Sequence, residues 1–127
     1  MDTIYRRAGW IAESNIYEVN LRQYSAEGTF NAFAKALPRL KDMGVEILWF
    51  MPIHPIGKIN RKGTLGSYYS IADFKAVNPE FGTEAEFKNL IKLAHNLGMR
   101  VIMDWVANHA AWDNVWTNDH SEYFVKD

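Results

Sequence analysis

Three polar side chains that could act in chemistry follow a short apolar segment, and they are spaced i, i+4 and i+5. They are Asp104, Asn108 and His109, directly after Val101-Ile102-Met103. Apolar residues at neighbouring positions indicate a strand with both faces covered. Polar side chains at the end of such a strand are typical of a site at the carboxyl edge of a parallel sheet. Each of them alone is more often a cap, a turn residue or a structural histidine than a functional group.

Three segments are predicted to be strands. Residues 16–21 alternate between apolar and polar side chains, which indicates a strand with one apolar face. Residues 45–51 are almost continuously apolar, as expected for a strand buried on both faces. The third strand covers about residues 100–104 and leads into the polar motif.

The first predicted helix lies between the first two strands. Thr29 is a suitable N-cap, the apolar residues behind it recur at steps of three and four as far as Met43, and Gly44 is a suitable C′ glycine. Pro38 interrupts this pattern, because proline lacks the backbone donor and crowds the preceding turn. We expect a kink at this proline rather than a second helix.

The second predicted helix begins with a capping box formed by Thr83 and Glu86, and Gly98 closes it. The resulting order of strand, helix, strand, helix, strand predicts a parallel α/β fold. Both a doubly wound sheet and a (β/α)8 barrel fit this order. No glycine-rich phosphate loop follows the first strand, which counts against a nucleotide-binding fold.

The composition limits the class of protein. A chain of 127 residues is long enough for one domain. Fifteen acidic residues against fourteen basic ones argue against a nucleic-acid partner, and the absence of cysteine excludes disulfides and thiolate metal sites. No membrane-spanning run or signal core occurs, so a cytoplasmic location is expected, or a secreted or periplasmic one if a signal peptide has been removed. The five tryptophans suit either a dense core or sugar binding.

The motif Asp-x-x-x-Asn-His, which starts at Asp104, is similar to the first conserved region of the α-amylase superfamily, glycoside hydrolase family 13. Residues 16–24 resemble the family's first barrel strand, and residues 48–53 resemble its second. Residues 67–74 and 78–83 resemble the loop after that second strand, where a tyrosine precedes an aspartate by four residues and Gly-Thr starts the next helix.

This resemblance implies the N-terminal portion of a (β/α)8 TIM barrel, with about three strands and two helices. Residues 1–15 would be an N-terminal extension, residues 16–110 the first part of the catalytic barrel, and residues 111–127 the start of domain B, inserted after strand 3. The family's catalytic acids come from later strands, so no catalytic residue is expected in this stretch. A barrel of this type takes about 250 residues, and the remainder of the chain would be needed to complete it.

The resemblance also assigns roles to single residues. Tyr69 matches the tyrosine that stacks on the sugar at the cleavage point, and His109 matches the histidine that hydrogen-bonds a hydroxyl of that sugar. Asp104 matches a supporting aspartate. Asn108 matches an asparagine that binds calcium in many members, so calcium is the one cofactor expected. The implied substrates are α-1,4-linked glucans such as starch and maltodextrin.

Several alternatives to an α-amylase-type retaining hydrolase stay open. Transglycosylase, branching and isomerase members share these N-terminal segments, and a non-catalytic barrel could serve as a binding or partner subunit. A metal-dependent hydrolase using Asp104, His109 and Asp113 is a further hypothesis. His54 and His120 match no diagnostic position and are expected to be surface or loop residues.

Overall fold

The computed structural model describes residues 8–125. Residues 1–7 of the predicted extension and the last two residues of the predicted insertion lie outside this range. In the described part of the extension, Gly9–Ile11 form the short 3-10 helix η1. The guanidinium of Arg100 lies 4.1 Å from the ring centroid of Trp10, so this extension is attached to the sheet by a cation–π contact.

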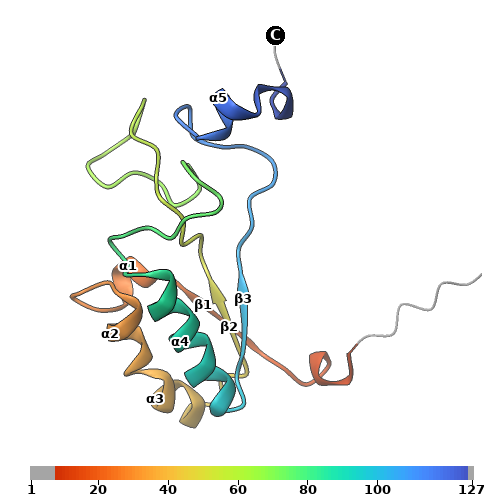
Figure 1. Cartoon of the computed structure of the whole chain (residues 1–127). Helices are drawn as coiled ribbons and strands as arrows, with labels where there is room; N and C mark the ends of the chain where they lie inside the picture. Colours follow the sequence, from red (N-terminus) through yellow and green to blue (C-terminus); the bar gives the residue numbers. More distant parts are fainter. Residues whose placement is uncertain (1–7, 126–127) are drawn as a thin grey trace, which may run out of the picture.

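The centre of the fold is a sheet of three parallel strands (Figure 1). They are β1 (Ile16–Val19), β2 (Ile47–Phe50) and β3 (Arg100–Met103), and they lie side by side in chain order. Val19 is paired with Phe50, and Phe50 with Met103. The carboxyl ends of all three strands therefore meet at one edge, and the predicted parallel α/β arrangement is confirmed.

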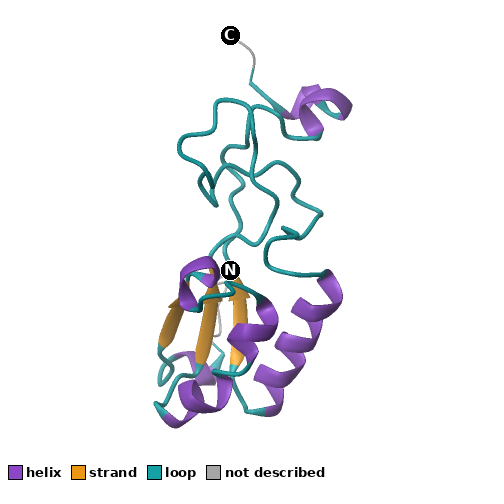
Figure 2. Cartoon of the chain, turned by 90° about the vertical axis from the view of Figure 1, so that its left-hand side faces the viewer, coloured by secondary structure: helices purple, strands orange, loops and turns teal. Residues whose placement is uncertain are grey.

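Three helices cover one side of this sheet, as Figure 2 shows. They are α2 (Phe30–Ala34), α3 (Leu37–Asp42) and α4 (Glu84–Asn96). Helices α2 and α4 contact β2 through aromatic rings, because the ring of Phe50 lies 5.3 Å from that of Phe33 and 5.7 Å from that of Phe87, edge to face in both cases. Such pairs add about 0.5–1.5 kcal/mol each to the burial of their surface. This core fixes β2, and with it the loop that β2 leads into.

The helix termini follow the predicted chemistry. The Thr83 hydroxyl accepts from the Glu86 backbone N–H at 3.2 Å, and the Glu86 carboxylate accepts from the Thr83 backbone N–H at 2.6 Å. The predicted capping box is therefore confirmed. Gly44 and Gly98 have φ angles of +89° and +75°, as a C′ glycine that ends a helix in the left-handed region should.

The predicted kink at Pro38 is wrong, because the segment forms two helices. Helix α2 ends at Ala34, and α3 begins at Leu37, so Pro38 lies in the first turn of α3. The first backbone N–H groups of a helix have no partner within it, so proline loses no hydrogen bond there. The proline therefore starts the second helix instead of bending a single one.

The predicted strands are also too long. The first ends at Val19 rather than residue 21, and Leu21–Tyr24 form the short helix α1. Leu21 is buried, so its apolar side chain joins the core from a helical turn. The second strand is confined to residues 47–50, and the third ends before Asp104.

Two long segments rise from the carboxyl ends of the strands and lie against each other (Figures 1 and 2). One is the loop of residues 51–83, and the other is residues 104–125, which include α5 (Trp116–Asp119) and the 3-10 helix η2 (Ser121–Tyr123). The backbone N–H of Ala111 donates to Ile71 O at 2.9 Å, and further bonds join the same stretches. Among the described helices, none is both long and apolar enough to span a membrane.

Candidate functional site

The structure brings two of the predicted site residues together at the carboxyl edge of the sheet. The Tyr69 hydroxyl donates a hydrogen bond of 3.0 Å to Asp104 Oδ2. Asp104 is the first residue after β3, and its own backbone N–H donates to Phe50 O at 2.9 Å. The carboxylate is therefore held by the sheet, while the tyrosine reaches it from the loop after β2. Both side chains are half-buried.

The electrostatic surroundings keep the Tyr69 phenol protonated. Burial, the hydrogen bond to Asp104 and the negative charges of Asp104 and Glu18 raise the pKa of Tyr69 above its usual value. Glu18 belongs to β1, so acidic groups from two strands act on this one ring. A neutral phenol can donate to a carboxylate, and the donation fixes where the hydroxyl end of the ring lies.

Asn108 and His109 form a second pair, and both are exposed. The Asn108 side-chain nitrogen lies 3.3 Å from His109 Nδ1. An amide nitrogen only donates, so Nδ1 is the acceptor in this contact and the proton of the neutral ring lies on Nε2. The Nε2–H group is then available as a hydrogen-bond donor to a ligand.

The second pair lines a cavity of about 700 Å³ that is rich in aromatic side chains. Phe74 and Trp116 stack on each other there, with ring centroids 5.1 Å apart. Within the described residues, Tyr69 and Asp104 are not part of this lining. The four predicted site residues thus form two pairs, one at the strand ends and one in the segment that follows β3.

Calcium takes six to eight oxygen ligands. Asn108 offers one side-chain oxygen, and residues 8–125 contain no group of three or more His, Cys, Asp or Glu side chains that could hold a metal ion. Backbone and amide carbonyl oxygens are also calcium ligands, so the role of Asn108 stays a prediction.

The metal-dependent hydrolase hypothesis is not supported either. Asp113 Oδ2 accepts hydrogen bonds from the backbone N–H groups of Lys58, at 2.7 Å, and Ile59, at 3.3 Å. The first of these bonds contributes most to a pKa of Asp113 below its usual value. Asp113 thus joins two loops, while Asp104 is bonded to Tyr69.

The two histidines without an assigned role differ in their surroundings. His120 is partly exposed and stacks on Tyr123 with ring centroids 4.8 Å apart. His54 lies in a loop, as predicted, but the expectation of a surface position is wrong, since only 6% of it is exposed. Its Nδ1 lies 2.9 Å from Ala76 O and donates to it, which ties together two distant parts of the loop after β2.

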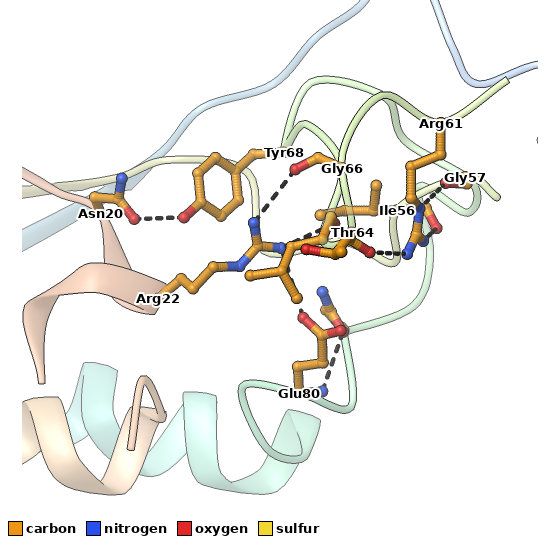
Figure 3. A network of polar contacts seen from close by, with 11 residues as sticks. Asn20, Arg22, Ile56, Gly57, Arg61, Thr64, Gly66, Tyr68 and Glu80 are labelled. Atoms are coloured by element: carbon orange, nitrogen blue, oxygen red, sulfur yellow. Dashed lines mark hydrogen bonds and ion pairs between the residues drawn. The ribbon is translucent and has the colours of Figure 1, made fainter. Parts of the chain in front are cut away.

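A group of residues next to Tyr69 was not predicted from the sequence. Arg22 and Tyr68 contact each other, and the Tyr68 hydroxyl donates to Asn20 Oδ1 at 2.6 Å (Figure 3). The two adjacent tyrosines, Tyr68 and Tyr69, were the one feature of the sequence that could have pointed to this group. Only the three-dimensional arrangement shows that one tyrosine faces Arg22 and the other faces Asp104.

Comparison with known proteins gives a consistent result. The family model for the alpha amylase catalytic domain matches residues 7–127. The fold is similar to the crystal structure of an alpha-amylase from Lactobacillus plantarum, with 50% sequence identity, a TM-score of 0.88, and coverage of 90% of this chain and 27% of that one. A maltogenic alpha-amylase from Thermotoga neapolitana gives 47% identity and a TM-score of 0.86, over 90% of this chain and 28% of that one.

The sequence is also similar to curated relatives with another name. An alpha-1,4-glucan:maltose-1-phosphate maltosyltransferase from Rhodospirillum rubrum is 38% identical over 93% of this chain and 19% of its own length. The same enzyme from Cereibacter sphaeroides is 36% identical over 85% of this chain and 21% of its own length. The chain thus spans about a fifth of the length of these relatives.

Proposed function

Because the chain belongs to the α-amylase catalytic-domain family, we propose that it forms the N-terminal part of the (β/α)8 barrel of a longer enzyme. That enzyme cleaves α-1,4-linked glucans such as starch and maltodextrin, with retention of configuration. The observation that carries the proposal is the hydrogen bond between Tyr69 and Asp104 at the carboxyl edge of three parallel strands. Barrels of this type place their active sites at that edge.

In this proposal, Tyr69 provides a platform for the sugar ring at the cleavage point. An aromatic face packs on the C–H groups of a pyranose, and the bond to Asp104 fixes the ring before substrate arrives. Asp104 therefore supports the site and is not a catalytic residue. His109 donates from Nε2 to a hydroxyl of the same sugar, with Asn108 holding the opposite ring nitrogen.

These residues orient the substrate, and the bond-breaking groups come from the later part of the barrel. Retaining hydrolysis needs a carboxylate nucleophile and an acid about 5 Å apart on either side of the glycosidic bond. The nucleophile forms a covalent glycosyl intermediate, and water then releases it. Positioning matters to both steps, since a well-oriented substrate avoids a large part of the entropic barrier. We also propose Asn108 as one calcium ligand, with further oxygens completing the coordination.

A transferase is the second candidate, supported by the names of the curated relatives at 36% and 38% identity. It would use the same N-terminal residues and pass the glycosyl group to an acceptor other than water.

The test is to incubate the intact enzyme with maltoheptaose, with and without inorganic phosphate, and to analyse the products by chromatography. Hydrolysis produces shorter glucans and new reducing ends. Transfer produces longer glucans without new reducing ends, or a sugar phosphate when phosphate is present. Proton NMR of fresh product should show the α-anomer first. An initial β-anomer would refute retention, and binding without products would identify a non-catalytic barrel.

A further inference from the structure

We propose that Arg22 is a positioning residue for Tyr69, acting through Tyr68 and the turn that precedes it. This inference rests on the proposed role of Tyr69 as a sugar platform. Arg22 lies in α1, directly after β1, whereas Tyr69 lies in the loop after β2. A side chain from the first strand–helix junction would thus set the position of a ligand-binding residue from the second.

Arg22 makes contacts with the turn that precedes the tyrosine doublet, as Figure 3 shows. Its two terminal nitrogens donate to the backbone carbonyls of Gly66 and Leu65, each at 3.3 Å. One of these nitrogens also lies 3.5 Å from Glu80 Oε2. The Arg22 side chain is only 18% exposed, whereas Glu80 is 51% exposed. The ion pair is therefore screened by water, and the bonds to the carbonyls define the position of the turn.

Arg22 and Asn20 together hold the ring of Tyr68. The Arg22 guanidinium carbon lies 4.5 Å from the centroid of that ring, and the Tyr68 hydroxyl donates to Asn20 Oδ1 at 2.6 Å. Asn20 and Arg22 flank the start of α1, which is fixed by the buried Leu21. The face and the hydroxyl end of Tyr68 are thus both held by one rigid part of the fold.

The position of Tyr69 is sensitive to this restraint because the loop around it contains almost no regular secondary structure. Residues 51–83, all of which the structure describes, contain neither helix nor strand apart from an isolated bridge between Ile56 and Ile71. Tyr69 is the next residue after Tyr68, and it reaches Asp104 on the other side. With Tyr68 released, Tyr69 would keep its bond to Asp104 but lose the restraint from the first strand–helix junction, so that bond would have to offset more of the conformational entropy of the ring.

Lysine cannot replace Arg22 in this role. The guanidinium is a planar fork that reaches two carbonyls and also lies over an aromatic ring, whereas an ammonium group is a compact charge. Substitution of Arg22 should affect the melting temperature less than it affects kcat/KM. Its Nε is buried with no hydrogen-bond partner among the described residues, so desolvation offsets part of what the other contacts contribute. The effects on the site and on stability can therefore be separated.

The experiment is a double-mutant cycle in the intact enzyme, with kcat/KM on maltoheptaose and the melting temperature as readouts. The variants are Arg22→Lys, Tyr69→Ala and the two combined. Arg39→Lys is the matched control, because Arg39 also contacts a tyrosine, Tyr24, at 2.6 Å, from helix α3. Tyr68→Phe is a milder second variant, since it removes only the bond to Asn20.

Arg22→Lys should lower kcat/KM about tenfold, since a misplacement of about 1 Å costs up to about 100-fold. In the Tyr69→Ala background the same change should cost less than about twofold, because the two residues act as one unit. Tyr68→Phe should show a smaller loss, of about threefold, with the same dependence on Tyr69. Arg39→Lys should leave kcat/KM unchanged.

Equal losses in both backgrounds would show that Arg22 does not act through Tyr69, and would overturn the inference while leaving the proposed function intact. An unchanged kcat/KM for Tyr69→Ala alone would instead remove Tyr69 from the site, and this inference with it. If Arg22→Lys does not fold, Tyr68→Phe decides, and an unchanged kcat/KM for that variant overturns the inference.

Discussion

The bond between Tyr69 and Asp104 makes a quantitative prediction about two substitutions at position 69. Tyr69→Phe keeps the ring and removes the hydroxyl, whereas Tyr69→Ala removes both. In the structure, that hydroxyl donates to Asp104 Oδ2 at 3.0 Å, and both side chains are half-buried. The two variants therefore separate the orientation of the ring from the contact that its face makes.

The magnitudes follow from these contacts. A hydrogen bond to a charged group contributes about 1.5–3 kcal/mol, and partial exposure to water reduces this to about 1 kcal/mol. Tyr69→Phe should therefore lower kcat/KM about fivefold. Loss of the ring removes stacking of about 1 kcal/mol as well as its apolar contact with the sugar, about 2–3 kcal/mol in total. Tyr69→Ala should then lower kcat/KM by about 30- to 150-fold.

The assay is steady-state hydrolysis of maltoheptaose by the intact enzyme, with circular dichroism to check folding. Tyr24→Phe is the matched control, because the Tyr24 hydroxyl also has a charged partner, Arg39, at 2.6 Å, within the helical layer. This control should leave kcat/KM unchanged. If Tyr69→Phe and Tyr69→Ala lose the same activity, the ring face does not contact the sugar, and stacking is the wrong explanation.

Three further predictions concern other parts of the chain. His109→Ala should lower kcat/KM by about two- to twelvefold, as expected for a hydrogen bond of about 0.5–1.5 kcal/mol to an uncharged hydroxyl; an unchanged value would remove His109 from the site. Asp113→Ala should lower the melting temperature, because two backbone N–H groups lose their acceptor, and the control Asp42→Ala, at an exposed residue, should not. The folded-state pKa of Asp113 is below its unfolded-state value. Its contribution to stability is therefore present above the unfolded-state pKa and is lost as the pH falls through the folded-state pKa. In Asp113→Ala, the free energy of unfolding should depend less on pH across this acidic range. Residues 1–127 expressed alone should associate, because within residues 8–125 the outer edges of β1 and β3 are unpaired, and should release no sugar from starch, because the catalytic acids are expected from later strands. A monodisperse monomer with well-dispersed amide signals would contradict the first expectation, and reproducible sugar release the second.

Local signals in the sequence predicted the local structure well. The capping box at Thr83 and the C′ glycines at Gly44 and Gly98 are all found as predicted. Each of these depends on side-chain and backbone chemistry within a few residues, so a sequence window contains all the necessary information. Pro38 was misread for a related reason. The apolar spacing around Pro38 is the same whether the proline lies inside one long helix or in the first turn of a second one. The two cases are distinguished only by the end of α2 at Ala34.

Long-range contacts could not be predicted in the same way. Tyr69 and Asp104 were each proposed as site residues, but nothing in the sequence indicates that they are bonded across 35 positions. Arg22 was missed because all its partners are more than 40 positions away, and two of them are backbone carbonyls, which no side-chain pattern reveals. His54 was expected at the surface because loops are usually exposed, yet it is buried, and its Nδ1 donates to a carbonyl 22 residues away.

The two loops above the sheet pack so closely that they restrict each other's movement. A side chain at Gly57 would collide with Ala111 and with the Asp113 carboxylate, so only glycine allows this approach. Asn114, which is fully buried, donates to Ile71 O at 2.9 Å and so joins the same two segments. These contacts fix the segment after β3 against the loop after β2, while Arg22 and Asp104 hold the tyrosine doublet from below. The sugar-binding part of the proposed site is thus arranged by contacts within the first three strands and their loops. The bond-breaking groups of the later strands would then meet a platform whose geometry does not depend on them.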